Sequence, residues 1–528
     1  MPITEDGPRQ VVPRWRLFKE SMTRGELMPL TPLLAPRFNE EHLAERILDW
    51  KESPSLSVAA DLVSCAIALG LDRVAADAAM FVISNKSAPA PARNLAAIYL
   101  QQSGIDVPER AGIDVSADTS KATGQLLTPE NGRQIYEIHR LRCSLRAYPN
   151  NPIQWMNLAL LYTSAGDFPK ARRAVQAALH LAPVNRFVLR SASRFFLHIG
   201  ERDRAHKLLS RSPSVHADPW ILAAEIATAD SMQRTSGFIK HARRTMEQRR
   251  FDNQQVSELA SAIGTLEYKA GKDRDGRKHL AASLLEPSEN AIAQAGWIAR
   301  KFTSNFYLPE AQLKASPEAA AWDGYELSNW KRSLQQALLW QDDQPFSSRP
   351  AIHGSFVAAT VFEDFAQAKQ IAVRGLLSNR SDPTLVNNFV FAATMNGDLD
   401  IAIEEAKHLE IDSLASKERI AVLATRGLIA FRSDNKEVGR VLYREAIELA
   451  RKERDEAREA QAKAYLAMEE LRSGTTNATQ MCEEAIRLAK SLHSPLGTVL
   501  GDMVERRLGR EPQSRSESLP IKPRPIIL

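Results

Sequence analysis

Apolar residues recur at helical spacing along most of the chain, and the clearest stretch begins near Pro152. Residues spaced i, i+3, i+4 and i+7 fall on one face of a helix. In this stretch they are Trp155, Leu158, Ala159 and Tyr162. A turn at Gly166 leads to a second periodic segment that contains Ala171 and that Pro183 brings to an end. The pattern predicts two antiparallel helices joined by a tight turn.

The same punctuation returns further along the chain. A small turn residue is followed five positions later by a small helix residue at Gly70 and Ala75, Gly166 and Ala171, Gly200 and Ala205, Gly271 and Gly276, and Gly397 and Ala402. Gly166 and Gly200 are 34 residues apart, and Phe365 and Leu399 repeat at the same interval. A fixed period of this length is typical of a repeat protein. We therefore expect roughly ten helix hairpins between about residues 56 and 490.

These residues resemble the tetratricopeptide motif, W-x2-L-G-x2-Y followed by A-x3-F and P, with Ala159 in place of the glycine and Val175 in place of the aromatic residue. The resemblance implies an all-α fold, a right-handed α-solenoid of stacked antiparallel helix hairpins whose inner face is lined mainly by the first helix of each unit. Small residues at Ala159 and Ala171 should let paired helices approach closely. Trp155 and Tyr162 should fill the gap between units.

Breaks in the repeat divide the chain into five predicted parts. The N-terminal arm is proline-punctuated, with basic and aromatic residues, and the C-terminal tail is polar and proline-rich, which favours disorder. The parts are an arm at 1–37, a first array at 38–302 with an insertion near 105–131, a divergent repeat or joint at 303–350, a second array at 351–508, and a disordered tail at 509–528.

The sequence lacks the common motifs of enzymes and metal sites. The chain lacks a P-loop, a G-x-S-x-G elbow and an H-E-x-x-H zinc motif, and its three cysteines form no C-x-x-C pair. We therefore expect no enzymatic activity, no cofactor and no metal. No secretory signal or apolar stretch long enough to span a membrane is present in the sequence, so we expect a cytoplasmic protein.

Charge is distributed unevenly. The chain carries a net charge of +5, yet residues 131–280 hold 25 lysines and arginines against 13 acidic residues. Arg190, Arg194 and His198 follow at i, i+4 and i+8 in a helix without an acidic residue, so they should form one basic stripe that faces the inner groove.

Two partners suit this charge. The first hypothesis is a protein-interaction scaffold, or adaptor, whose basic groove binds an acidic segment of another protein through Arg190, Arg194 and His198. The alternative is a nucleic-acid-binding solenoid that contacts phosphates through residues 131–280. The sequence leaves the identity of the partner and the oligomeric state open.

Overall fold

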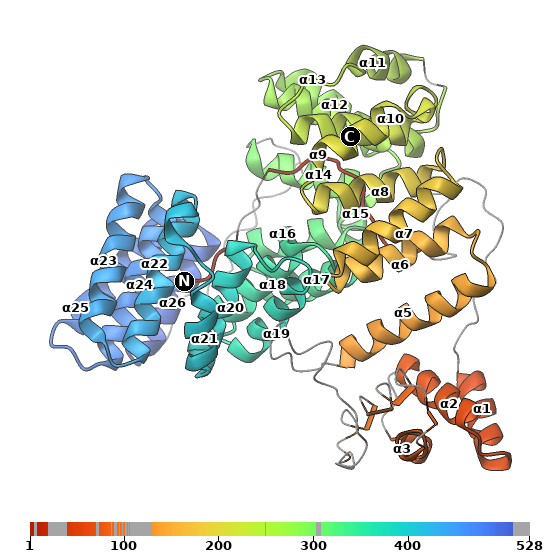
Figure 1. Cartoon of the computed structure of the whole chain (residues 1–528). Coiled ribbons are helices and arrows are strands. Elements are labelled where there is room, and N and C mark those ends of the chain that lie inside the picture. The colour runs from red at the N-terminus through yellow and green to blue at the C-terminus, as the bar shows by residue number, and fades with distance from the viewer. Residues whose placement is uncertain are drawn as a thin grey trace. The chain divides into compact units, whose positions relative to one another are not determined.

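The computed structural model describes residues 1–4, 8–18, 40–69, 129–248, 250–302 and 308–510, with shorter stretches between 73 and 105. From residue 40 onward the described chain forms helices joined by short turns, and the described residues contain no β-strand (Figure 1). Most of the predicted insertion, 106–128, and the predicted tail from 511 onward lie outside the described residues.

The helices fall into two compact units. The smaller unit comprises residues 18–162 and 170–181, and the larger unit comprises residues 1–17, 163–169 and 182–528. The described helices centred on the smaller unit are α1 (Glu40–Glu52), α2 (Leu56–Leu69), α3 (Ala76–Ser84), α5 (Pro129–Ala147), α6 (Pro152–Ser164) and α7 (Phe168–Leu181). The five-part division predicted from the sequence stays a prediction.

The larger unit holds most of the helices. They are α8 (Arg186–His198), α9 (Arg202–Ser210), α10 (Pro219–Ser231), α11 (Ile239–Glu247), α12 (Asn253–Lys269), α13 (Asp273–Ser283), α14 (Glu289–Lys301), α15 (Glu310–Lys314), α16 (Pro317–Glu326), α17 (Trp330–Asp343), α18 (Ser348–Thr360), α19 (Phe365–Leu376), α20 (Pro383–Asn396), α21 (Leu399–Ala406), α22 (Ser416–Arg432), α23 (Lys436–Lys452), α24 (Glu456–Arg472), α25 (Ala478–Ser491) and α26 (Pro495–Arg507). Short 3₁₀ turns at Pro213–His216 and Ile411–Ser413 lie between them.

Helices of the larger unit pack in two directions. Each hairpin pairs consecutive helices, as in α12 with α13, α16 with α17 and α22 with α23. The first helices of successive hairpins also pack together, as in α12 with α14, α14 with α16 and α20 with α22. In such a stack each hairpin buries its apolar face against its neighbours. The predicted all-α solenoid is confirmed.

Local signals place the helix ends. Asp218, Asp252 and Ser288 each accept a hydrogen bond from a backbone N–H of the helix that they precede, which satisfies donors that the helix itself leaves free. Four of the predicted turn glycines have a positive φ, between 73° and 92°, which strongly favours glycine. They are Gly166, Gly200, Gly271 and Gly397. The repeat punctuation in the sequence therefore marks real hairpin turns.

Buried positions of the first motif agree with the pattern except at one residue. Ala159 and Ala171 are fully buried, and Tyr162 is buried as well. Trp155, in contrast, is only partly buried, and its indole N–H donates to the carbonyl oxygen of Pro149 at 2.8 Å. The expectation that Trp155 fills the space between units stays a prediction, and the structure adds that its indole is bonded to the preceding turn.

Candidate functional site

Residues 1–4 and 8–17, here called the N-terminal segment, are extended and lie against the larger unit (Figure 1, dark red). The segment has no helix of its own, yet four apolar side chains are at most 5% exposed: Met1, Ile3, Val11 and Trp15. Its hydrogen-bond partners are hundreds of residues away in the sequence. The segment is therefore held by tertiary contacts alone.

Side-chain amides hold the main chain of the segment. Asn388 on α20 accepts from the N–H of Ile3 at 2.7 Å and donates to its carbonyl oxygen at 2.8 Å. Asn290 on α14 donates to the carbonyl oxygen of Val12 at 2.9 Å. Three further amides donate in the same way: Asn387 to Met1 (2.7 Å), Gln461 to Pro2 (3.0 Å) and Gln294 to Arg9 (3.0 Å). Main-chain bonds of this kind select an extended backbone, whatever its sequence.

Carboxylates of the larger unit form ion pairs with the arginines of the segment. Arg9 donates through Nε and Nη2 to both oxygens of Glu318, at 2.8 and 3.0 Å, and both side chains are almost fully buried. Arg14 and Arg349 donate to the same carboxylate at 2.8 and 2.7 Å. Burial alone would raise the pKa of Glu318, but the charges of Arg9, Arg349 and Arg14 outweigh it and hold that pKa well below its usual range.

Further contacts fix the end of the segment. Arg16 donates to Glu289 at 2.6 Å, and Arg14 lies 3.4 Å from a carboxylate oxygen of Asp343. Between these arginines, the side chain of Trp15 is 0% exposed. Its ring centroid lies 6.1 Å from that of Phe195 and 5.5 Å from that of Phe346. The segment thus combines charged contacts with one large aromatic anchor.

The three residues of the predicted stripe lie on one helix, α8, but have different surroundings in the structure. Arg190 is buried, and its Nη2 lies 3.0 and 2.9 Å from the two carboxylate oxygens of Glu258 on α12. Its guanidinium also stacks 4.6 Å from the Trp220 ring centroid. The carboxylate absent from its own helix is thus supplied by another one. Changing Arg190 to glutamate would place two carboxylates together at this buried position, so we expect that change to destabilise the fold.

His198 differs from Arg190 in its surroundings. Its ring lies 5.7 Å from Phe168 and 5.2 Å from Phe346, measured between centroids. Burial, and after it the charge of Arg194, lowers the pKa of His198 to about 4, so the ring is neutral at pH 7. A neutral imidazole adds no positive charge to the stripe. A role of Arg190 and His198 in partner binding stays a prediction.

Arg194 borders a pocket. The pocket has a volume of about 1040 Å³ and opens beside Pro8, Gln10 and Val12 of the N-terminal segment. Its charged lining consists of six cationic side chains and two carboxylates: Arg194, Arg202, Arg234, Arg243, Lys269, Lys272, Asp230 and Glu267. The lining is therefore strongly basic, and we call this cavity the basic pocket.

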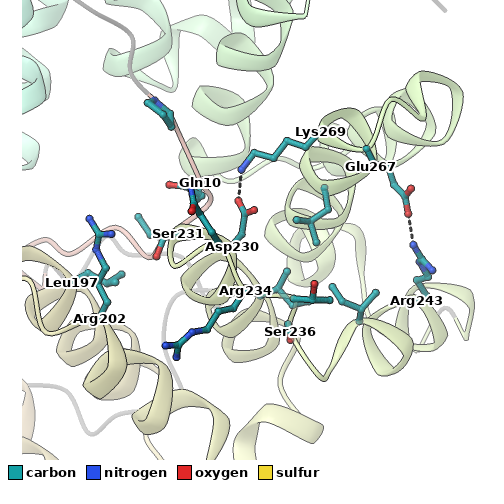
Figure 2. Close-up of a pocket in the computed structure, with 18 of the residues that line it drawn as sticks. Gln10, Leu197, Arg202, Asp230, Ser231, Arg234, Ser236, Arg243, Glu267 and Lys269 are labelled. Carbon is teal, nitrogen blue, oxygen red and sulfur yellow. Dashed lines mark hydrogen bonds and ion pairs between the residues drawn. The ribbon is translucent and has the colours of Figure 1, made fainter. Parts of the chain in front are cut away.

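Several of these charges are paired. Figure 2 shows the ion pairs of Lys269 with Asp230, at 2.5 Å, and of Arg243 with Glu267. Arg194 and Arg202 have no ion pair within the described part of the chain; Arg194 instead stacks 4.9 Å from the Phe346 ring centroid. Burial, and next the charge of Arg349, lowers the pKa of Arg194 to about 10, so it stays charged at pH 7. The charge of Glu318 raises that pKa in part, but among the described residues no carboxylate forms an ion pair with Arg194, so this guanidinium favours a further anion nearby.

Sequence reasoning missed the N-terminal segment as a site. The signal was present, because Arg14, Trp15 and Arg16 alternate charge and ring in an arm without helical periodicity. The sequence did not indicate which residues the arm contacts, since Glu289 and Glu318 look like ordinary helix-surface residues.

Two findings concern other kinds of site. Among the described helices, none is long and apolar enough to cross a membrane. In the same described residues, no three or more histidine, cysteine or acidic side chains are grouped as metal ligands would be.

Comparison with known proteins gives structural likeness only. The chain is similar to yeast Tom70, with 16% identity and a TM-score of 0.29 over 72% of this chain and 91% of that one. It is also similar to the APC/C hetero-tetramer Cut9-Hcn1, with 10% identity and a TM-score of 0.36 over 88% and 92%. No family model and no curated protein matches the sequence.

The repeat motif at Trp155–Pro183, the paired helices and the positive-φ turn glycines are features of this chain itself. Each is what a tetratricopeptide hairpin requires. The described structure therefore has the all-α fold of stacked helix hairpins that the resemblance to the tetratricopeptide motif implied.

Proposed function

We propose that this chain is a non-catalytic protein-interaction scaffold that binds an acidic segment of a partner protein in the basic pocket. The observation that carries the proposal is the placement of Arg194 and Arg202, which line the pocket without an ion-pair partner among the described residues. Each guanidinium can donate paired, charge-assisted hydrogen bonds to a carboxylate. The proposal keeps Arg194 from the predicted stripe as its central residue.

The size of the pocket supports a peptide ligand. A volume of about 1040 Å³ is at the upper end of the roughly 300–1,000 Å³ typical of small-molecule sites. A single inorganic anion would leave most of this space to water. Several residues of an extended acidic segment would instead reach the cations on both sides.

The nucleic-acid alternative has less support. Every cationic residue of the pocket lies in the basic region 131–280, so phosphates could meet the same charges. Binding of single strands, however, usually uses exposed aromatic rings on which bases stack. The aromatic residues of α8 that could serve are buried, with Phe187 at 7%, Phe195 at 0% and Phe196 at 1% exposure. We therefore favour a protein partner.

A binding titration tests the proposal. A labelled polyglutamate peptide should bind the full chain, and Arg194→Glu combined with Arg202→Glu should weaken binding at least tenfold, since each charged hydrogen bond contributes about 1.5–3 kcal/mol. Arg204→Glu is the matched control, because Arg204 is on the same helix as Arg202 but pairs with Glu201 and does not line the pocket.

Two outcomes would contradict the proposal. Equal loss in the Arg204→Glu control would mean that only the general field of the basic region attracts the peptide. Tight binding of a single-stranded oligonucleotide that weakens steeply with salt, together with no binding of polyglutamate, would favour the nucleic-acid alternative.

A further inference from the structure

The surface beneath the N-terminal segment is assembled from the first helices of several hairpins, together with Asp343 at the end of α17. Amide side chains on α14, α20 and α24 bond the main chain of the segment, while α16 supplies the carboxylate that holds Arg9. We call this surface the segment-binding face and define it by Glu289, Asn290, Gln294, Glu318, Asp343, Asn387, Asn388 and Gln461. It is separate from the lining of the basic pocket, with which it shares no residue.

The segment-binding face is polar, and this is unusual for a surface that is only a packing layer. Asn290, Gln294, Glu318, Asn387 and Asn388 are each at most 3% exposed, yet all of them end in polar atoms. Polar groups are costly to bury unless they are hydrogen-bonded, so a purely structural contact would favour apolar side chains. If the segment leaves, water can satisfy these groups. The face is therefore suited to release a segment as well as to hold one.

Apolar side chains of the segment meet apolar side chains of the helices, since Met1 and Ile3 belong to a buried core cluster and Trp15 packs against Phe195 and Phe346. The side chains of Ile3, Val11 and Trp15 are buried against the larger unit. Amide side chains of the segment-binding face donate hydrogen bonds to main-chain carbonyl oxygens of the segment. This division, with anchors on the ligand and backbone bonds from the receptor, is typical of extended-peptide recognition. The helices also pack directly against one another, as in α20 with α21 and α22.

The charge of the face sets the class of ligand. Glu289, Glu318 and Asp343 lie along it and pair with arginines of the segment. An arginine at the first position, followed by arginines five and seven residues later, reproduces the spacing of Arg9, Arg14 and Arg16. An acidic segment would meet three carboxylates here and be repelled.

We infer that the segment-binding face is a peptide-binding site for an extended, arginine-bearing segment of a partner protein, and that the N-terminal segment occupies it as an intramolecular ligand that such a partner displaces. A tethered ligand lowers the apparent affinity of a competitor by the fraction of time that the face is free. Partner binding would therefore be held back until the N-terminal segment loosens.

The probe is a labelled peptide with the sequence of residues 1–18, added to the full chain. Wild type should bind it weakly. Arg9→Ala combined with Arg14→Ala loosens the tethered segment and should increase the affinity for the peptide at least tenfold, because the competitor is weakened while the face is intact. Adding Glu318→Gln should abolish that gain. A peptide in which both arginines are alanine is the matched control and should not bind.

A second measurement tests the inference without the Arg9→Ala, Arg14→Ala variant, in case that variant does not fold. A protease site is inserted between residues 19 and 39 of the wild-type chain, the chain is cut, and the labelled peptide is added in excess. Exchange of the peptide for the cut segment, with helical circular dichroism unchanged, supports the inference. A cut chain that never exchanges its segment, or that loses helix content as the segment leaves, would show that the segment is a fixed part of the fold.

The alternative to a segment tethered to its own face is the segment of a second copy of this chain. Light scattering on the wild-type protein should give a mass independent of concentration, because the ligand is tethered to its own face. A dimer that dissociates on dilution, and that Arg9→Ala with Arg14→Ala abolishes, would overturn the intramolecular assignment. None of these experiments uses polyglutamate or the basic pocket, so their failure leaves the proposed acidic-segment site unaffected.

Discussion

Trp15→Ala should release the N-terminal segment from the larger unit. The indole is 0% exposed and contacts Phe195 and Phe346, whose ring centroids lie 6.1 and 5.5 Å away. Removing a fully buried large aromatic side chain typically costs about 3 to 5 kcal/mol. Because about 1.4 kcal/mol corresponds to a factor of ten, the undocked population should rise between about a hundredfold and a few thousandfold.

Trypsin provides a direct assay, since the segment carries its own cleavage sites. In the docked state Arg9 is 5% exposed, and its carbonyl oxygen accepts a hydrogen bond from Gln294, so the bond after Arg9 is protected. When docking is fast relative to cleavage, the cleavage rate follows the undocked population. Mass spectrometry should therefore show cleavage after Arg9 accelerated by the same factor, up to the rate for a free peptide.

A matched tryptophan serves as the control. Trp155 is only partly buried and belongs to the smaller unit, so Trp155→Ala should leave the cleavage rate after Arg9 unchanged. If Trp15→Ala also leaves that rate unchanged, with the same helical circular dichroism, the indole does not hold the segment. Burial of the indole would then contribute nothing to docking of the segment.

Two predictions concern the fold around the site. The folded pKa of His198, about 4, is below its ordinary 6.5, so the unfolded chain takes up the proton first; the stabilisation is full above pH 6.5 and is lost as pH falls to about 4. At about 1.4 kcal/mol per pKa unit the lost stabilisation amounts to about 3 kcal/mol. His198→Phe should therefore remove the fall in the free energy of urea unfolding between pH 6.5 and pH 4. An unchanged slope of that free energy against pH would contradict the prediction. Gly276→Ala would place a Cβ 2.6 Å from the Tyr268 ring and should lower the melting temperature, at a cost of about 1–3 kcal/mol. Gly501→Ala, whose nearest neighbour is 3.8 Å away, should not lower it.

The hairpins could be predicted from the sequence because their signals are local. Gly200 and Gly397 mark left-handed turns, and the residues that pack around each turn lie within a few positions of it. The charge pairs could not be predicted in this way. Arg190 was expected to be unpaired because its own helix has no acidic residue, but its partner Glu258 is 68 residues away. Periodicity shows which face a residue occupies, and not which neighbour faces it.

The N-terminal segment shows the same limit at a larger scale. Asn388 is separated from Ile3 by 385 residues, and an asparagine in a helix gives no indication that it will bond another part of the backbone. The segment and the basic pocket nevertheless meet, because Pro8, Gln10 and Val12 form part of the pocket wall. A docked segment therefore forms part of the wall of the pocket in which we propose that an acidic ligand binds. By the reciprocity of linked equilibria, an acidic ligand that contacts this wall must in turn stabilise the docked segment and oppose an arginine-bearing competitor.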